Sequence, residues 1–204
     1  FHSLQGESAS VGWRTVFVRL TGCPLRCGYC DTAYAFKGGD WWEIDDILGS
    51  VAQYQAHHVT VTGGEPLAQA DCLVLLTALC DVGYRVSLET SGAVDISRVD
   101  PRVVRVMDLK TPGSGELEKN LYANIDQLRP TDQVKFVITD EDDYRWSREQ
   151  LQRWDLTARC EVLFSPGAGD MPPQRVAVWI LRVHLDVRFL LQLLTLRWGV
   201  QPGR

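Results

Sequence analysis

The chain has 204 residues, 45% of them hydrophobic, and its formal net charge is -5 at pH 7. This length and composition predict one domain, residues 1–204, built around a single buried core. The negative charge argues against a broad basic surface for nucleic acid or anionic lipid, so a site for a small molecule is expected. The sequence has no long apolar run and no signal-peptide pattern, which predicts a cytoplasmic protein without a membrane partner.

Apolar, β-branched runs alternate with amphipathic stretches along the chain, a pattern typical of repeated βα units and a parallel sheet. Strands are predicted, in chain order, at residues 15–21, 58–62, 84–90, 103–109, 133–139 and 160–164. Helices are predicted at residues 43–54, 67–81, 117–128, 142–154 and 173–183, the first with Asp40 as a candidate cap. Residues 187–194 are expected to be extended or partly buried.

Segments rich in Gly, Pro and Cys follow the predicted strands and do not precede them. They are GCPLRCGYCDT after the first strand, GGEP after the second, TSG after the third, KTPGSGE after the fourth and SPGAG after the sixth. In a β/α barrel these positions form the C-terminal rim, where loops carry the chemistry on a rigid frame. Six units are too few to close an eight-stranded barrel. The predicted fold is therefore α/β, a partial (β/α)6 barrel of parallel strands that is open on one side.

Three cysteines, Cys23, Cys27 and Cys30, lie within one predicted loop in the order C-x3-C-x2-C. Thiolates are the ligands that iron-sulfur clusters require, and three of them leave one iron of a 4Fe-4S cluster without a protein ligand. This vacancy suits an exchangeable ligand. Such clustering, with only six cysteines in the chain, also favours a reducing compartment over a disulfide framework.

A structural zinc site is the alternative interpretation of these cysteines. One of the histidines would complete it, namely His2, His57 or His58. Structural zinc usually draws two pairs of ligands, and the sequence offers no second pair, so a zinc-stabilised binding module is the weaker hypothesis. The other cysteines stand in apolar stretches and are expected to be inert core thiols.

The cysteine loop, with Tyr29 directly before Cys30, resembles the cluster loop of the radical S-adenosylmethionine superfamily. The resemblance implies a partial barrel of that superfamily's type. It also implies that S-adenosylmethionine chelates the open iron and that one electron from the cluster cleaves it to a 5'-deoxyadenosyl radical. An electron donor such as flavodoxin or ferredoxin is implied as a partner.

TGGEP, residues 62–66, resembles the superfamily's second motif. Gly64 allows a close backbone approach and Glu65 can pair with the methionine ammonium. Further cofactor contacts are implied at Tyr29, Asp31, Glu89, Ser91, Lys110 and Ser165. The residues alone leave other interpretations open: GGEP can be a turn before a helix, Glu89 can cap a turn, and Lys110 can be a solvated lysine.

The opening FHSLQGES, followed by VFVRLTGC, resembles the 7-carboxy-7-deazaguanine synthase family. The resemblance implies that the pterin-like ring of the substrate meets Leu4, Gln5, Gly6, Glu7 and Thr62. Arg19 lies in a strand expected to be buried on both faces, where an unpaired guanidinium is costly. A substrate carboxylate would pair with it bidentately, and an internal salt bridge is the alternative.

The implied reaction converts 6-carboxy-5,6,7,8-tetrahydropterin to 7-carboxy-7-deazaguanine with loss of ammonia. The resemblance further implies Mg²⁺ bound at Thr32, although the Asp-Thr pair can equally be an ordinary turn, and it implies a homodimer. The C-terminus departs from the family: the chain reads LQLLTLRWG and places Leu194 where a histidine is expected. Another radical S-adenosylmethionine enzyme, such as a glycyl-radical activase, is the alternative function.

Overall fold

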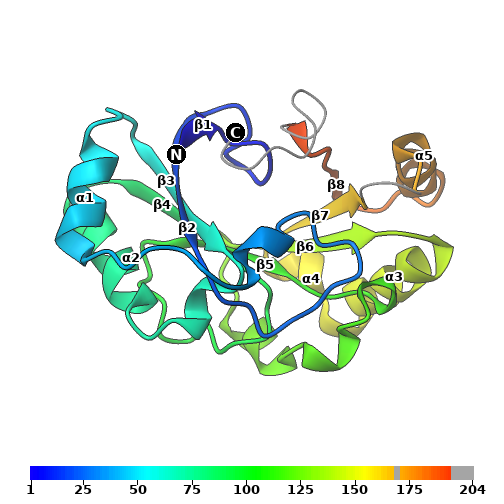
Figure 1. Ribbon diagram of the computed structural model, residues 1–204. Helices are drawn as coiled ribbons and strands as arrows, with labels where there is room; N and C mark the ends of the chain where they lie inside the picture. Colours follow the sequence, from blue (N-terminus) through cyan, green and yellow to red (C-terminus); the bar gives the residue numbers. More distant parts are fainter. Residues whose placement is uncertain (168–170, 194–204) are drawn as a thin grey trace.

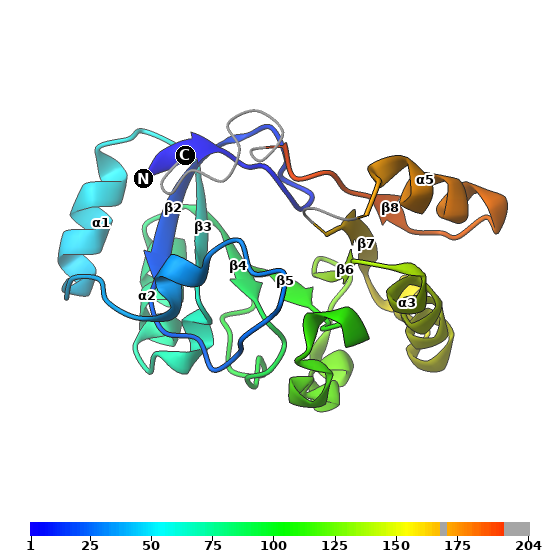
Figure 2. The ribbon, with the colours of Figure 1, turned by 45° about the vertical axis from the view of Figure 1, so that its right-hand side comes forward.

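The computed structural model describes residues 1–167 and 171–193 (Figure 1). Its strands are β1 His2–Leu4, β2 Arg14–Leu20, β3 His58–Gly63, β4 Arg85–Thr90, β5 Val104–Asp108, β6 Gln133–Ile138, β7 Glu161–Pro166 and β8 Arg188–Phe189. Its α-helices are α1 Ile44–Ala52, α2 Cys72–Asp81, α3 Glu141–Trp154, α4 Leu156–Arg159 and α5 Pro173–Arg182. The helices lie along the outer side of a curved sheet, with α1 and α2 at one end and α3 and α5 at the other (Figures 1 and 2).

The strands of the described residues form one mixed sheet in the order β1 to β8. All six predicted strands are present as β2 to β7, and each pairs in parallel with its neighbour. The ends of the sheet, β1 and β8, do not pair with each other, so the barrel is open as predicted.

One further strand, β1, was not predicted, and it runs antiparallel to β2, with His2 opposite Val16. The connection between the two strands is short and turns back through Ser8 and Gly12, both at positive φ. A short reversal can join only antiparallel neighbours, because a parallel pair needs a crossover.

The central strands alternate between an apolar outer face and a polar inner face. On β3, Val59 and Val61 are buried in the core with Leu76 of α2, whereas Thr60 and Thr62 lie on the other face. The expectation that the strand of Arg19 is buried on both faces holds only for its first half, because residues 15–17 are buried whereas residues 18–20 are partly exposed. The inner face is polar because it lines the site.

Four of the helix predictions agree with the structure apart from their ends, and that for residues 117–128 was wrong. This stretch forms two short 3₁₀ helices, Leu117–Lys119 and Tyr122–Gln127. Between them, the Asn120 side chain bonds both the N–H and the C=O of Lys110, which holds its segment against the strand end and out of a continuous helix.

Two details at helix starts also differ from expectation. The residue at the N-cap of α1 is Glu43 and not Asp40, and its side chain makes no capping bond. The predicted helix at 67–81 begins as a separate 3₁₀ turn, Pro66–Ala68, before α2. None of the helices in the described parts of the chain has the length and apolarity that crossing a membrane requires.

Candidate active site

The cysteine loop after β2 runs across the rim of the sheet (Figure 2). It is held there by the loop after β5 and by the GGEP segment after β3. Gly28 N–H donates to the Ser114 carbonyl at 3.0 Å. Arg26 N–H donates to the Glu116 carboxylate at 2.5 Å. Residues beyond β5 thus fix the backbone between Cys23 and Cys30, as expected for a loop that must present three thiols in one arrangement.

GGEP packs against the start of the same loop. Glu65 N–H donates to the Gly22 carbonyl at 2.7 Å, and Gly64 N–H donates to the Leu20 carbonyl at 3.0 Å. A Cβ atom at Gly64 would lie 2.2 Å from the Gly22 oxygen and 2.9 Å from Cys23 Cβ. Only glycine fits between the two loops at this point.

All three loop thiols are free and partly exposed. Burial raises the pKa of Cys23 and of Cys27, and the Lys110 ammonium opposes this rise at both residues. A ligand thiol must lose its proton, and a nearby cation favours the thiolate. The remaining cysteines, Cys72, Cys80 and Cys160, are buried, as predicted for core thiols.

The geometry does not favour the zinc hypothesis. His58 pairs with Thr15 at the beginning of β2. The last residue of that strand, Leu20, lies about 17 Å further on at the usual rise per residue, and Cys23 follows it in the loop. His2, on β1, stacks on Tyr54. Across the described residues, no three Cys, His, Asp or Glu side chains are grouped to hold a single metal ion. In a four-iron cluster each thiolate binds its own iron, so the three thiols need not converge on one atom.

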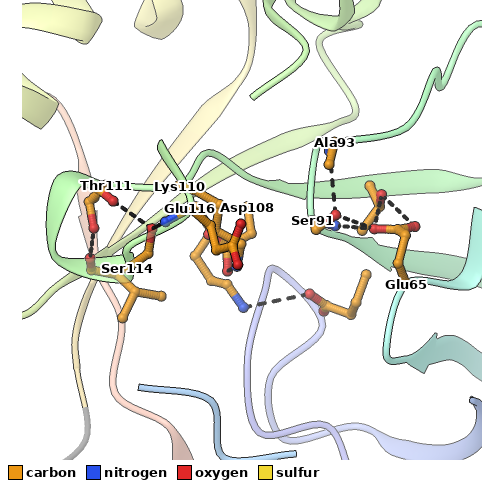
Figure 3. A network of polar contacts seen from close by, with 12 residues as sticks. Glu65, Ser91, Ala93, Asp108, Lys110, Thr111, Ser114 and Glu116 are labelled. Carbon is orange, nitrogen blue, oxygen red and sulfur yellow. Dashed lines mark hydrogen bonds and ion pairs between the residues drawn. The ribbon is translucent and has the colours of Figure 1, made fainter. Parts of the chain in front are cut away.

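Glu65 is fully buried, and its carboxylate is already occupied by protein donors (Figure 3). It accepts from Leu67 N–H at 3.0 Å, from Thr90 Oγ1 at 3.0 Å and from both N–H and Oγ of Ser91 at 2.6 and 2.5 Å. The structure thus gives Glu65 and Ser91 a role in joining the ends of β3 and β4. Their predicted contact with the cofactor stays a prediction.

Charged side chains from three strands and the β1–β2 loop meet on the inner face. Lys135 of β6 lies 2.7 Å from the Glu7 carboxylate and 3.8 Å from that of Glu89 on β4. Asp108 of β5 pairs with Lys110 at 3.0 Å, and the two residues lie side by side in Figure 3. Lys110 is 7% exposed, so the interpretation of it as a solvated lysine was wrong.

Burial raises the pKa of Glu89 to about 7, against the lowering influence of the Lys135 charge. A carboxyl with such a pKa can exchange a proton near neutral pH. The sequence analysis missed Lys135 and Asp108 as site residues. A signal for Lys135 existed, because QVKFVI places one charge inside an apolar strand, as VFVRL does for Arg19.

The predicted substrate residues at the end of β1 and in the β1–β2 loop differ in exposure. Leu4 is exposed, whereas Gln5 is buried and its side chain is used inside the protein. It donates to Thr60 Oγ1 at 3.0 Å and accepts from Glu7 N–H at 3.2 Å. Gly6 accepts from Leu193 N–H at 3.1 Å. Gln5 thus anchors the loop that carries Glu7 over the inner face.

Arg19 and Thr62 stand side by side on β2 and β3. The Arg19 guanidinium lies 5.8 Å from the Phe1 ring centre and 5.7 Å from that of Tyr34. In the described parts of the chain it has no carboxylate within ion-pair distance, and its buried Nε has no hydrogen-bond partner. The structure thus does not support the alternative of an internal salt bridge.

The other predicted site residues lie on the rim. Thr32 Oγ1 donates to the Asp31 carboxylate at 2.7 Å, and this pair stands just before a 3₁₀ turn, Ala33–Phe36. The ring of Tyr29, in the cysteine loop, faces the Lys110 ammonium at 5.8 Å. Leu194 lies outside the described residues.

Among the residues that the structure describes, four buried polar atoms on the inner face have no hydrogen-bond partner. They are Arg19 Nε on β2, Glu89 Oε1 on β4, Asp108 Oδ1 on β5 and Ser165 Oγ on β7. Buried polar atoms are normally paired, so this set of donors and acceptors fits a polar ligand that carries both kinds of group. S-adenosylmethionine, with its ammonium, carboxylate and ribose, is such a ligand, and the three thiols of the cysteine loop fit an iron-sulfur cluster.

Comparison with known proteins agrees with this geometry. The sequence profile of the Radical SAM superfamily matches residues 17–108. A 7-carboxy-7-deazaguanine synthase of Chlorobaculum tepidum is 42% identical over 202 residues, which cover 98% of this chain and 92% of the relative. The protein of the same name from Koribacter versatilis is 41% identical and covers 94% and 92%. That from Thermoplasma acidophilum is 34% identical and covers 100% and 97%.

Solved structures show the same fold. QueE from Escherichia coli superimposes with a TM-score of 0.75 at 23% identity and covers 95% of this chain and 91% of its own. Streptococcus suis SuiB bound to S-adenosylmethionine has a TM-score of 0.62 at 15% identity, with coverage of 90% and 52%. On the identity and coverage of its relatives, the chain belongs to the 7-carboxy-7-deazaguanine synthase family of the radical S-adenosylmethionine superfamily.

Proposed function

We propose that the chain converts 6-carboxy-5,6,7,8-tetrahydropterin to 7-carboxy-7-deazaguanine and ammonia, a step of queuosine and 7-deazapurine biosynthesis. The observation that carries this proposal is the 42% identity, over nearly the whole length, to a relative named for the product. Membership of the superfamily implies a 4Fe-4S cluster and S-adenosylmethionine. When bound, these two groups supply a carbon radical that removes a hydrogen atom from the substrate.

The three loop cysteines would hold the cluster and leave one iron for S-adenosylmethionine. The unpaired acceptor atom of Asp108 and the unpaired hydroxyl of Ser165 are available to the polar groups of that cofactor, whereas we assign Glu89, which shares Lys135 with Glu7, to the substrate ring. Gly64 keeps the backbone of the second motif within contact of the cysteine loop. The role of these residues is to bind and orient the reacting groups.

Arg19 would bind the substrate carboxylate. Its partly buried guanidinium has no carboxylate within ion-pair distance in the described residues, and Thr62 stands beside it. A planar guanidinium pairs with a carboxylate through two parallel hydrogen bonds, which fixes both position and orientation. Glu7 and Glu89 can accept from the N–H groups on the pyrimidinone edge of the ring, while Gln5 holds the loop that carries Glu7.

We also propose Mg²⁺ at Thr32. The Thr32 hydroxyl donates to the exposed Asp31 carboxylate at 2.7 Å, and Mg²⁺ commonly retains water and substrate oxygens as its other ligands. A homodimer, a cytoplasmic location and a flavodoxin-like or ferredoxin-like electron donor complete the proposal. Six free thiols in the described residues suit a reducing compartment.

The test is an anaerobic assay of the reconstituted protein with S-adenosylmethionine, a reductant, Mg²⁺ and the carboxylated pterin. The proposal predicts 7-carboxy-7-deazaguanine and ammonia in equal amounts. Arg19→Gln is expected to raise KM at least about a hundredfold, because it removes a paired charge-assisted contact. Arg98→Gln, at an exposed position away from the inner face, is the matched control. A wild-type protein that binds the cofactor and forms no deazapurine would contradict the proposal.

A further inference from the structure

Lys135 is the one lysine of β6, a strand that the structure describes in full, and it lies on the inner face of the sheet. Its neighbours Val134 and Phe136 are both fully buried in the core on the other face. The Lys135 side chain is only 12% exposed, so its ammonium is largely desolvated. A buried ammonium is costly unless protein groups replace the lost water.

Two carboxylates replace this water, one from the β1–β2 loop and one from β4. Glu7 reaches the ammonium from the β1–β2 loop at 2.7 Å, and Glu89 from β4 at 3.8 Å. The second oxygen of Glu7 accepts from Gln192 Nε2 at 3.0 Å. Glu7 is therefore held in one orientation from two directions, whereas Glu89 keeps one oxygen without a partner.

Within the described residues, the charges that act on Glu89 come from four elements. Lys135 on β6 and Arg19 on β2 favour its ionised form, and Glu7 and Asp108 oppose it. Lys110, beside Asp108, offsets part of the Asp108 charge. Lys135 makes the largest electrostatic contribution, and burial acts against it. Small changes in this balance decide how Glu89 is charged near neutral pH.

We propose that Lys135 is a positioning residue for the proposed reaction: its ammonium orients Glu7 toward the substrate ring and sets the charge of Glu89. This inference rests on the proposed function. Lys135 does not need to touch the substrate, because the carboxylates on either side of it do so. The free oxygen of Glu89 then accepts a hydrogen bond as an anion, which a neutral acid in its place does less well.

The substrate explains why such control is useful. Its pyrimidinone edge presents N–H donors, which favour an ionised acceptor. Two carboxylates close together repel one another, and without a cation between them one would take up a proton. A shared lysine lets Glu7 and Glu89 both face the ring as acceptors.

The experiment compares Lys135→Met, Lys135→Arg and Glu7→Gln, with Lys119→Met at an exposed position as the control. Each reconstituted protein is titrated by infrared spectroscopy, and the protonated carboxyl band of Glu89 is identified by its loss in Glu89→Gln. In the wild type this band should titrate near pH 7. In Lys135→Met the midpoint should rise by at least about one pH unit, and in Glu7→Gln it should fall. The pH profile of kcat/KM should shift with it.

Lys135→Arg keeps the charge and should keep both the titration and the profile. The inference is overturned if Lys135→Met and Lys135→Arg lose activity equally while the Glu89 titration stays at its wild-type midpoint. The Glu7→Gln shift has the opposite sign, so it tests the charge balance even if Lys135→Met does not fold. The infrared titration needs no turnover. A wild type without product would defeat the proposed function, and the titration would still decide whether Lys135 controls Glu89.

Discussion

Glu65, just after β3, accepts hydrogen bonds from both the backbone N–H and the hydroxyl of Ser91, just after β4. The contact joins the second motif to the neighbouring strand end, beside the place where GGEP meets the cysteine loop. One buried carboxylate therefore ties two strand ends of the rim together. The loops of the site take their positions from contacts of this kind.

Glu65→Gln should destabilise the protein by about 3 kcal/mol, because the amide turns one acceptor into a donor that faces other buried donors. Urea unfolding of the purified protein measures this. Glu118→Gln, at an exposed position in a short 3₁₀ helix, should change stability by less than about 0.5 kcal/mol. Equal stabilities of the two variants would show that Glu65 does not join the strand ends.

Gly64→Ala should weaken retention of the cluster at least about tenfold, because the added Cβ would overlap the backbone of Gly22 and press on Cys23. The measurement is iron and sulfide per protein chain after anaerobic gel filtration. Gly49→Ala is the matched control, since a Cβ at that position in α1 meets nothing within 4 Å. If both variants retain iron equally, the close packing of the two loops is unimportant for the cluster.

Replacement of Cys23, Cys27 or Cys30 by Ala, one at a time, should abolish iron binding at the stoichiometry of a four-iron cluster. Cys72→Ala removes a buried thiol from α2 and should leave the iron content unchanged. Absorbance of the brown protein near the visible cluster band reports the result. Loss of iron in the Cys72 variant, with retention in a loop variant, would place the cluster elsewhere.

Glu89 should make the stability of the protein depend on pH. Its pKa is about 7 in the folded chain and ordinarily 4.5, so the folded state holds the proton more tightly. This stabilisation is complete below pH 4.5 and is lost as pH rises through 7, by at most about 3 kcal/mol. The difference in unfolding free energy between wild type and Glu89→Gln should fall over that interval. A difference independent of pH would show that Glu89 titrates normally.

The strands and the rim could be predicted from the sequence because their signals are local. Runs such as HVTVT identify a strand without reference to partners, and the loop after a parallel strand must lie at the rim. The spacing C-x3-C-x2-C predicts a cluster site by itself, because all three cysteines lie in one loop. These parts of the site follow from neighbours along the chain.

Contacts between distant segments could not be predicted in this way. The partners of Lys135 are Glu7, 128 residues earlier, and Glu89, and no periodicity links them. The same holds for the bond between Glu116 and the cysteine loop. Residues 117–128 were expected to be helical because their hydrophobic periodicity contains no information about the hydrogen bonds that the Asn120 side chain makes to Lys110.

The most direct test of the account is electron paramagnetic resonance of the reduced, reconstituted protein with and without S-adenosylmethionine. The account holds that three cysteines leave one iron open to the cofactor. It predicts a 4Fe-4S signal whose g-values change when S-adenosylmethionine is added, and no signal in the Cys27→Ala protein. A signal that does not respond to S-adenosylmethionine, or a colourless protein that holds zinc, would contradict it.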